Sequence, residues 1–172
     1  MDTPEFTALL RRHAALIHKI ACAYCRDVAD RDDLVQEIAV QLWRSRTRYD
    51  ERYRHTTWIY RIALNVAISF YRRERRHRNR TSEIDEHLLV VEPAAPSGEI
   101  QRLLGCIGEL GPLDRALVLL YLEGNDHGSI GEVLGISTSN VGTKLGRIRS
   151  KLREALDRPA RANHEKDPHG AG

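Results

Sequence analysis

The sequence predicts an all-α protein made of two small helical domains joined by a flexible linker. Apolar residues recur at steps of three and four over most of the chain, which is the helical period. The 172 residues are 41% hydrophobic, enough for packed cores in one or two small domains. Two Pro and a Gly interrupt the periodicity between Glu92 and Gly98. We expect a first domain over 1–80, a linker over 81–98, a second domain over 99–157 and a disordered tail over 158–172.

The first predicted helix begins at Pro4 and continues for about five turns to Tyr24. It carries His18, Cys22 and Cys25 at i, i+4 and i+7, a spacing that could supply three zinc ligands. Small Cys side chains also fill helix-packing faces, and no fourth ligand is near in the sequence. Packing is therefore the favoured interpretation, a metal or redox role for the three residues stays open, and we expect no metal site and no cofactor.

A second helix is expected from Asp30, a good N-cap, to about Arg46. Its beginning is acidic, because five carboxylates and one Arg lie between Asp27 and Glu37, a net charge of −4. Apolar residues recur on one face of this helix, so the acidic and amide side chains fall on the opposite face, toward solvent. That solvent face carries Asp33, Gln36, Glu37 and Gln41.

These carboxylates allow two interpretations, one structural and one catalytic. Asp32 and Asp33 can simply oppose the positive end of the helix, with Glu37 a solvated charge. Asp33 and Glu37 at i, i+4 could instead share a divalent metal in a nuclease-like site. No third acid or His at useful spacing supports a nuclease, which stays a distant alternative.

The next segment is strongly basic. Twelve Arg and three acids lie between Arg44 and Arg80, a net charge of +9. Residues 48–56 are too polar and aperiodic for a core element and predict a loop, after which Thr56 or Thr57 caps a helix that runs from Thr57 to about Arg76. The predicted core face of that helix comprises Ile59, Ile62, Ala63, Val66 and Phe70.

A second stripe on the same helix points to nucleic acid. It consists of Trp58, Arg61, Asn65, Ser69 and Arg72. A Trp, an Asn and two Arg on one face can stack on unpaired bases, bond to base edges and hold phosphates. Trp58 could alternatively be core and the Arg solvated, yet the cationic run that follows would repel itself without a polyanion nearby.

The second domain has the helix-turn-helix pattern. After helices over 100–107 and 115–123, a short helix over 127–134, a turn over 135–137 and a longer helix to about Leu156 are expected, with Thr138 or Ser139 as the cap. Residues 137–153 carry five cations and no acid, as expected of a helix that enters a major groove. Gly142 and Gly146 weaken that helix, but could allow close backbone approach.

The remaining composition bears on location. No apolar run approaches the roughly 20 residues that span a bilayer, so we expect no membrane insertion. Three Cys form no even disulfide framework, and the N-terminus lacks the pattern of a leader. We expect a cytoplasmic protein.

Several motifs together resemble the bacterial extracytoplasmic-function sigma factors, the minimal members of the primary sigma family. Asp32-Asp33-Leu34-Val35-Gln36-Glu37-Ile38, with Leu42-Trp43-Arg44, is similar to the region 2 signature, and Trp58 to Asn65 and Arg72 to Arg76 are similar to the segments that follow it. Leu110 to Arg153 is similar to region 4, with Gly131 in place of the usual Ala. The two matches cover most of residues 5 to 156 in the expected order and spacing.

The resemblance implies a DNA-reading initiation subunit without catalysis, which directs core RNA polymerase to promoters and assists strand opening. It implies docking on the clamp helices and flap of the polymerase, contact with duplex and melted promoter DNA, and an anti-sigma factor as a further candidate partner. The rival interpretation is a stand-alone helix-turn-helix regulator that needs no polymerase.

The implied sites fall into three sets. The core-polymerase set is Asp32, Asp33, Gln36 and Glu37. The −10 DNA set is Tyr49, Arg52, Tyr53, Arg54, His55, Trp58, Arg61, Asn65, Arg72, Arg73 and Arg76. The −35 DNA set is Ser137, Ser139, Asn140, Thr143, Lys144, Arg147, Arg149 and Lys151.

Overall fold

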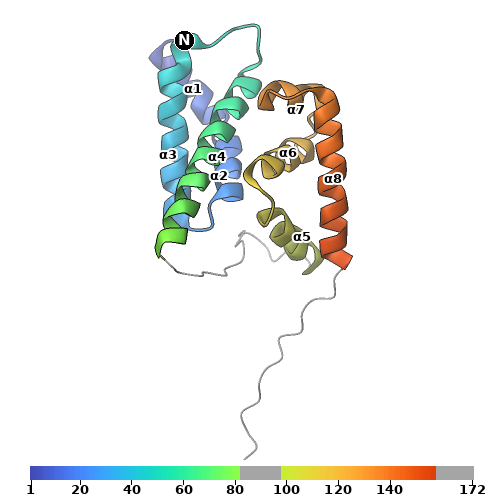
Figure 1. Ribbon diagram of the computed structural model, residues 1–172. Coiled ribbons are helices and arrows are strands. Elements are labelled where there is room, and N and C mark those ends of the chain that lie inside the picture. Colours follow the sequence, from blue (N-terminus) through green and yellow to red (C-terminus); the bar gives the residue numbers. More distant parts are fainter. Residues whose placement is uncertain (82–97, 158–172) are drawn as a thin grey trace, which may run out of the picture.

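A computed structural model describes residues 1–81 and 98–157, and every regular element within those two ranges is helical. The all-α prediction is confirmed. The helices of 1–81 form one bundle, and those of 98–157 form a second bundle beside it (Figure 1). The predicted linker and tail, apart from Thr81 and Gly98, lie outside the described residues.

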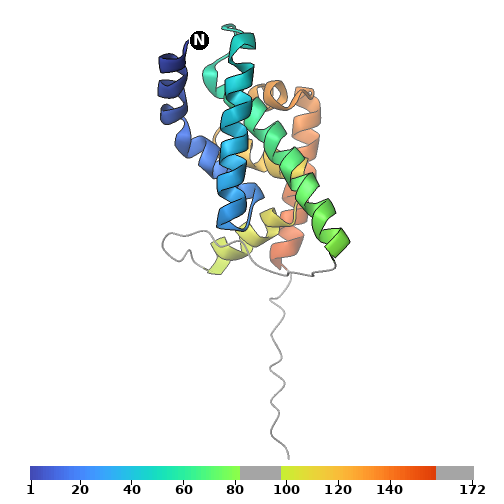
Figure 2. The same ribbon diagram turned by 90° about the vertical axis from the view of Figure 1, so that its left-hand side faces the viewer.

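The first bundle is built around the packing of two long helices. Leu34, Ile38 and Leu42 of the earlier one are fully buried against the helix that carries Ile59 and Ala63. Figure 2 shows these two helices crossing in front of the second bundle. The elements are α1 (Thr3–Arg12), α2 (Ala14–Tyr24), α3 (Val28–Ser45), the 3-10 turn η1 (Arg46–Arg48) and α4 (His55–Thr81).

The single five-turn helix expected at the N-terminus is wrong, because the chain breaks at His13 between α1 and α2. His13 has φ −108° and ψ 12°, and its N–H bonds back to carbonyls of the last turn of α1. The break lets Phe6 reach Trp43 of α3, where the two rings meet edge to face at 5.2 Å. That contact joins residues far apart in the sequence, so the local spacing of apolar residues does not predict the break at His13.

Two predicted helix starts are also wrong. Asp27, not Asp30, caps α3, with its carboxylate accepting a bond from the N–H of Ala29 at 3.0 Å. Helix α4 begins at His55, so Thr56 and Thr57 lie inside its first turn. The cap of α3 lies three residues before the predicted one, and α4 begins two residues before the predicted start. Several polar residues near each start could cap the helix, and the sequence does not show which of them does.

The buried face of α4 is wider than predicted. Ile59, Ala63 and Phe70 are buried as expected, but Ile62 and Val66 are only partly buried. Leu64 and Ala67, among others, are buried instead. The reason is that α4 contacts α2 and α3 on one side and the second bundle on the other.

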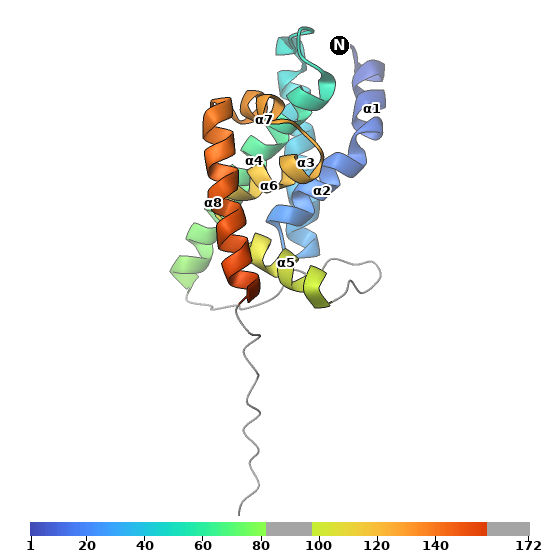
Figure 3. The same cartoon turned by 90° about the vertical axis from the view of Figure 1, so that its right-hand side faces the viewer.

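The second bundle contains the predicted helix-turn-helix. Its elements are α5 (Gly98–Gly108), α6 (Pro112–Leu122), α7 (His127–Leu134) and α8 (Thr138–Asp157), seen from the α8 side in Figure 3. Helix α6 begins at Pro112, three residues before the predicted start. Ser137, rather than Thr138 or Ser139, caps α8, since its Oγ accepts from the N–H of Asn140 at 3.2 Å.

Two glycines shape the turn between α7 and α8. Gly135 has φ +68°, in the left-handed region that favours Gly. Gly131 is the residue that departs from the usual Ala, and a Cβ there would lie 2.6 Å from the carbonyl oxygen of Ile136. The backbone of the turn occupies that space, so this chain uses Gly to bring its two helix-turn-helix helices close together.

Candidate nucleic-acid interface

The acidic face of α3 is exposed but not entirely free. Asp32, Asp33 and Gln36 are exposed. Glu37 is partly buried, and its Oε2 accepts a bond from Nη2 of Arg73 on α4 at 3.0 Å. Glu37 is therefore an ion-paired charge whose side chain is still 41% exposed. This hydrogen bond raises the pKa of the Arg73 guanidinium, and the ion pair joins the predicted polymerase and −10 DNA sets.

The loop before α4 is organised by aromatic rings. Tyr49 stacks on His55 with ring centroids 4.8 Å apart, and it meets Trp58 edge to face at 5.2 Å. The hydroxyl of Tyr49 donates to the carbonyl of Tyr53 at 2.6 Å, which closes the loop on itself. A ring cluster fixed in this way loses little freedom when a base stacks on it.

The charged residues of the loop are paired locally. Arg52 Nη2 lies 2.5 Å from Asp50 Oδ2, and the hydrogen bonds of Arg52 lower the pKa of the Asp50 carboxyl. Arg54 is exposed. The guanidinium of Arg61 lies 5.6 Å from the ring centroid of Tyr53.

The predicted stripe on α4 has a covered end and an open end. Near the loop, Trp58 and Arg61 are partly buried, and Arg61 donates to the carbonyl of Glu132 on α7 at 2.9 Å. Farther along, Asn65, Ser69 and Arg72 are exposed. Arg76 is also exposed and lies one turn beyond Arg72. The open end presents amide, hydroxyl and guanidinium groups in one row.

The outer face of α8 gathers most of the −35 DNA set. Lys144 is partly buried, and the other members of this face are exposed. They are Ser139, Asn140, Thr143, Arg147 and Lys151, with Ser137 at the cap. Within the described ranges none of these cations enters an ion pair. The N-cap of α7 is Asp126, whose pKa is lowered by hydrogen bonds from Ser129.

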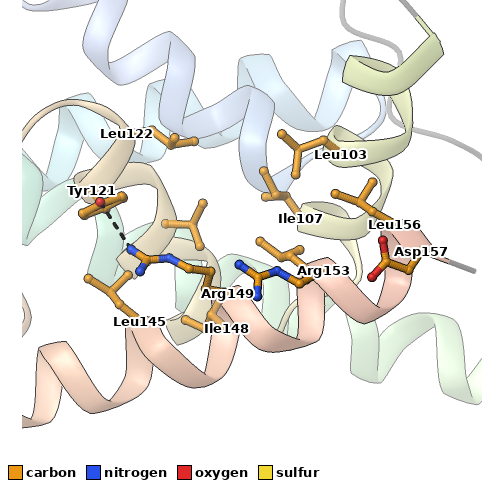
Figure 4. A pocket seen from close by; sticks show the side chains of 12 residues that line it. Leu103, Ile107, Tyr121, Leu122, Leu145, Ile148, Arg149, Arg153, Leu156 and Asp157 are labelled. Carbon is orange, nitrogen blue, oxygen red and sulfur yellow. Dashed lines mark hydrogen bonds between the residues drawn. The ribbon is translucent and has the colours of Figure 1, made fainter.

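Arg149 lies apart from that face. It lines an apolar groove of about 370 Å³ between α5, α6 and α8, and its Nη2 lies 3.4 Å from the hydroxyl of Tyr121. Figure 4 shows Arg149 and Arg153 beside this groove, with Leu103, Ile107 and Leu122 across it. Leu122 is 65% exposed. We did not predict this groove from the sequence, although the apolar run through Leu119 to Leu122 exceeds one helix face.

His18, Cys22 and Cys25 do not converge on one point. Cys22 Sγ lies 3.5 Å from His18 Nδ1, whereas Cys25 is buried in the core. In residues 1–81 and 98–157, no group of three or more His, Cys, Asp or Glu side chains is arranged to hold a metal ion. None of the helices described is long and apolar enough to cross a membrane.

Comparison with known proteins shows the family of the chain. The model of Sigma-70 region 2 matches residues 9–77, and that of Sigma-70 region 4 matches residues 100–152. The RNA polymerase sigma factor CarQ of Myxococcus xanthus is 30% identical over 161 residues, 88% of each chain. The chain belongs to the extracytoplasmic-function sigma factors. The family assigned from the motifs is confirmed.

Other relatives of this sigma factor agree. The ECF sigma factor SigE of Mycolicibacterium smegmatis is 28% identical over 89% of the chain, and the match spans 62% of SigE. CnrH of Cupriavidus metallidurans is 27% identical over 88% of the chain and 86% of CnrH. The chain is a sigma factor that directs promoter-specific transcription.

Two solved structures share the fold of this sigma factor. CnrH in complex with the cytosolic domain of CnrY has a TM-score of 0.68 at 26% identity, covering 92% of both chains. The sigma factor RpoE in complex with the anti-sigma factor NepR, from Bartonella quintana, has a TM-score of 0.71 at 17% identity, covering 91% of this chain and 99% of that one.

Proposed function

We propose that three separate faces divide the work of initiation: the acidic face of α3 docks on core RNA polymerase, the stripe on α4 holds the melted −10 strand, and the outer face of α8 reads the −35 duplex. The observation that carries this division is the sorting of charge by element. Carboxylates gather on α3, whereas cations gather on α4 and on one face of α8. A single chain with one acidic and two basic faces fits one protein partner and two stretches of DNA.

The face of α3 suits a basic helix of the polymerase clamp. Asp32 and Asp33 are exposed side by side in the early turns of α3. Exposed carboxylates speed encounter with a cationic surface and set its orientation. Glu37 contributes less to docking, since Arg73 already neutralises it.

The stripe on α4 suits single-stranded DNA. Tyr49, His55 and Trp58 supply stacking surfaces at one end, and Asn65 and Arg72 supply polar and cationic groups along the helix. Stacking on an aromatic ring contributes about 1–3 kcal/mol per base without strong sequence preference. The melted strand would then run from the loop toward Arg76.

The outer face of α8 suits duplex DNA. Ser137, Ser139 and Asn140 lie at its N-terminal end, which in helix-turn-helix proteins contacts base edges. Arg147 and Lys151 lie farther along the same face and would meet phosphates. The groove beside Arg149 lies on another side of α8, so it stays accessible to an apolar helix of the polymerase flap while α8 holds DNA.

We attribute no catalysis to the chain itself and place it in the cytoplasm, where the polymerase works. An anti-sigma factor is a further candidate partner. The main rival, a stand-alone regulator, would use only α7 and α8 and would bind its operator without polymerase. A nuclease would need a metal held by Asp33 and Glu37, and Glu37 is paired with Arg73.

Run-off transcription tests the proposal. Purified core enzyme is given promoter fragments from the source genome with and without the protein, and we expect new transcripts that depend on it. Asn65→Ala should reduce promoter opening, read by permanganate reactivity of the melted strand, whereas Arg75→Ala, off the stripe, should not. No stimulation on any promoter would reject the sigma role, duplex binding without polymerase would favour the regulator, and metal-dependent strand cleavage would favour the nuclease.

A further inference from the structure

The two bundles meet through a buried cation. Arg115 of α6 is only 4% exposed, and no carboxylate of residues 1–81 or 98–157 forms an ion pair with it. Its Nη1 donates to the carbonyl of Ala23, in the last turn of α2, at 2.9 Å. Its Nη2 donates to the carbonyls of Gly108 and Leu110, the latter at 3.1 Å. Three carbonyl oxygens, from helix ends or the turn after one, replace the water that this guanidinium would hold in solvent.

Aromatic rings of the first bundle complete the pocket around Arg115. Its guanidinium lies 5.4 Å from the ring centroid of Tyr24 and 5.0 Å from that of Tyr71. The hydroxyl of Tyr24 in turn donates to the carbonyl of Pro112, at the start of α6, at 2.7 Å. Gly108 and Leu110 belong to the bundle of Arg115 itself, but Ala23, Tyr24 and Tyr71 belong to the other one. Nη1 and Nη2 of Arg115 thus have hydrogen-bond acceptors, whereas its buried Nε has none among the described residues. Nη1 has its acceptor, and the guanidinium its aromatic neighbours, only when the two bundles are in contact.

The same contact covers one end of the −10 face. Arg61 donates to the Glu132 carbonyl of α7. A polar cavity of about 380 Å³ lies between the bundles, lined on one side by residues that include Arg54 and Tyr60 and on the other by residues that include Asp126 and Glu132. A strand lying along the loop and the first turns of α4 would need the space that α7 occupies. The outer face of α8 points away from this contact (Figures 1 and 3).

We infer that the free chain is held closed, with α7 covering the loop end of the −10 face, and that Arg115 anchors this closed arrangement. Binding of the melted strand then requires the bundles to separate, which takes Arg115 away from Ala23, Tyr24 and Tyr71. The inference rests on the proposed −10 role of α4. It makes Arg115 a positioning residue that touches no DNA and still sets how readily the free chain binds it.

The test measures binding of a fluorescent single-stranded −10 oligonucleotide to the free, full-length chain. A protein whose competent state is populated to about 10% binds about tenfold more tightly once fully opened. We therefore expect Arg115→Ala to bind the strand about tenfold more tightly than the parent, with unchanged affinity for a −35 duplex. Equal affinity of the two proteins for the strand would overturn the inference.

A second variant guards against misfolding of Arg115→Ala. Lys19 of α2 and Glu123 after α6 form an exposed ion pair across the contact, with Nζ and Oε1 2.6 Å apart. Lys19→Glu places two carboxylates together and should also tighten strand binding, whereas Lys19→Glu combined with Glu123→Lys should restore the parental value. Parental strand binding by a folded Lys19→Glu variant would count against the closed arrangement.

Cross-linking supplies the converse measurement. A carbodiimide activates the Glu123 carboxylate, the Lys19 amine displaces it, and an amide forms while the reagent leaves as a urea. The locked chain should lose strand binding, whereas Lys19→Arg, which keeps the charge but forms no such amide, should retain it after the same treatment. Strand binding by the locked chain would refute the inference. If neither the parent nor any variant binds DNA or stimulates transcription, the proposed function fails instead.

Discussion

The two faces that we propose to bind DNA differ in how far the protein itself already occupies them. On the first bundle, Arg61 bonds to Glu132, Arg73 pairs with Glu37 and Arg52 pairs with Asp50. On α8, Arg147 and Lys151 are exposed and enter no ion pair in the described part of the chain. Positive charge in the sequence marks both faces, but tertiary contacts decide which one is available before a partner binds.

This difference has a physical consequence for specificity. A free cationic face binds any DNA at a strength set by salt. A face whose cations are internally paired must exchange one set of contacts for another, so it responds to partners that open it. We therefore expect the first bundle to act after polymerase has bound, and α8 to be competent at once.

The largest expected effect is on polymerase binding. Asp33→Lys places a cation on the proposed docking face, and like charges opposed across an interface cost several kcal/mol. We expect affinity for core enzyme to fall by about 100-fold, about 2.8 kcal/mol at 1.4 kcal/mol per factor of ten. Glu37→Gln should have a smaller effect, because Glu37 is paired with Arg73.

The control for this prediction is Glu109→Lys, an equal charge reversal at an exposed site after α5. All three variants should unfold at the parental temperature, as is usual for surface changes. Titration of labelled core enzyme is the measurement. If Asp33→Lys binds core enzyme as tightly as the parent does, the acidic face of α3 is a solvent-exposed surface and not the docking site.

The next effect is on stability, and its sign differs between the glycines of the helix-turn-helix. Gly131→Ala should lower its stability by about 1–3 kcal/mol, the usual cost of overpacking, because the new methyl would meet the Ile136 carbonyl at 2.6 Å. Gly142→Ala and Gly146→Ala should each raise it by about 1 kcal/mol. A Cβ at Gly142 would make only ordinary contact with His127, and one at Gly146 would meet nothing within 4 Å.

Thermal unfolding followed by circular dichroism measures all three glycine changes. The two α8 glycines also bear on DNA, and we expect the double Gly142→Ala, Gly146→Ala variant to bind a −35 duplex less tightly despite its greater stability. Tighter binding would mean that these glycines are merely tolerated. A Gly131→Ala variant as stable as the parent would show that the turn can shift to admit a methyl group.

A smaller effect distinguishes two faces of α8 that carry the same charge. Arg147→Ala should weaken binding to a −35 duplex and reduce the salt slope by about 1, as expected when one phosphate contact is lost. Arg153→Ala removes the same charge from the groove side and should leave the slope unchanged. Arg149→Ala, also on the groove side, should behave like Arg153→Ala. The measurement is the affinity for the −35 duplex by fluorescence anisotropy across salt concentrations. If the salt dependence of binding has the same slope in all three variants, the two faces do not differ in their contact with DNA.

The smallest effect is a pH dependence of the contact between the bundles. Burial raises the pKa of Tyr24, against the opposing charge of Arg115, and burial followed by Glu123 raises the pKa of Tyr60 to about 12. Both pKa values exceed the ordinary 10.0, so the folded chain favours the neutral form of each tyrosine. The stability that these neutral side chains give to the contact between the bundles is fully present below pH 10 and is lost as the pH rises through the raised pKa values. Small-angle scattering should show the chain expanding between about pH 10 and 12, less so for Tyr24→Phe. A radius of gyration that does not change over this pH range would contradict the prediction that the contact weakens.

The sequence predicted what depends on local pattern. The helix-turn-helix follows from the spacing of apolar residues and from Gly135, and its short first helix was placed at the observed bounds. The exposure of Asn65 and Arg72 follows from the helical period. The family follows from motifs in two regions that occur in the right order.

What the sequence could not give depends on contacts between distant residues. The break at His13, the pairing of Glu37 with Arg73 and the partial burial of Ile62 each require knowledge of what packs against the helix. The local pattern predicts only that a helix begins at Arg115, because a single Arg among apolar residues does not show that three carbonyls will surround it. Charge alone does not distinguish Arg149 from the other cations of α8, and only the structure shows that it lines the apolar groove.

The central claim is that the proposed −35 face is open in the free chain, whereas α7 covers the loop end of the proposed −10 face in most free molecules until polymerase binds. Its most direct test compares the free chain with the holoenzyme on two probes, a −35 duplex and a single-stranded −10 oligonucleotide, at one salt concentration. We predict that the free chain binds the duplex but binds the strand at least about tenfold more weakly than the holoenzyme does. A free chain that binds the −10 strand as tightly as the holoenzyme would contradict the account.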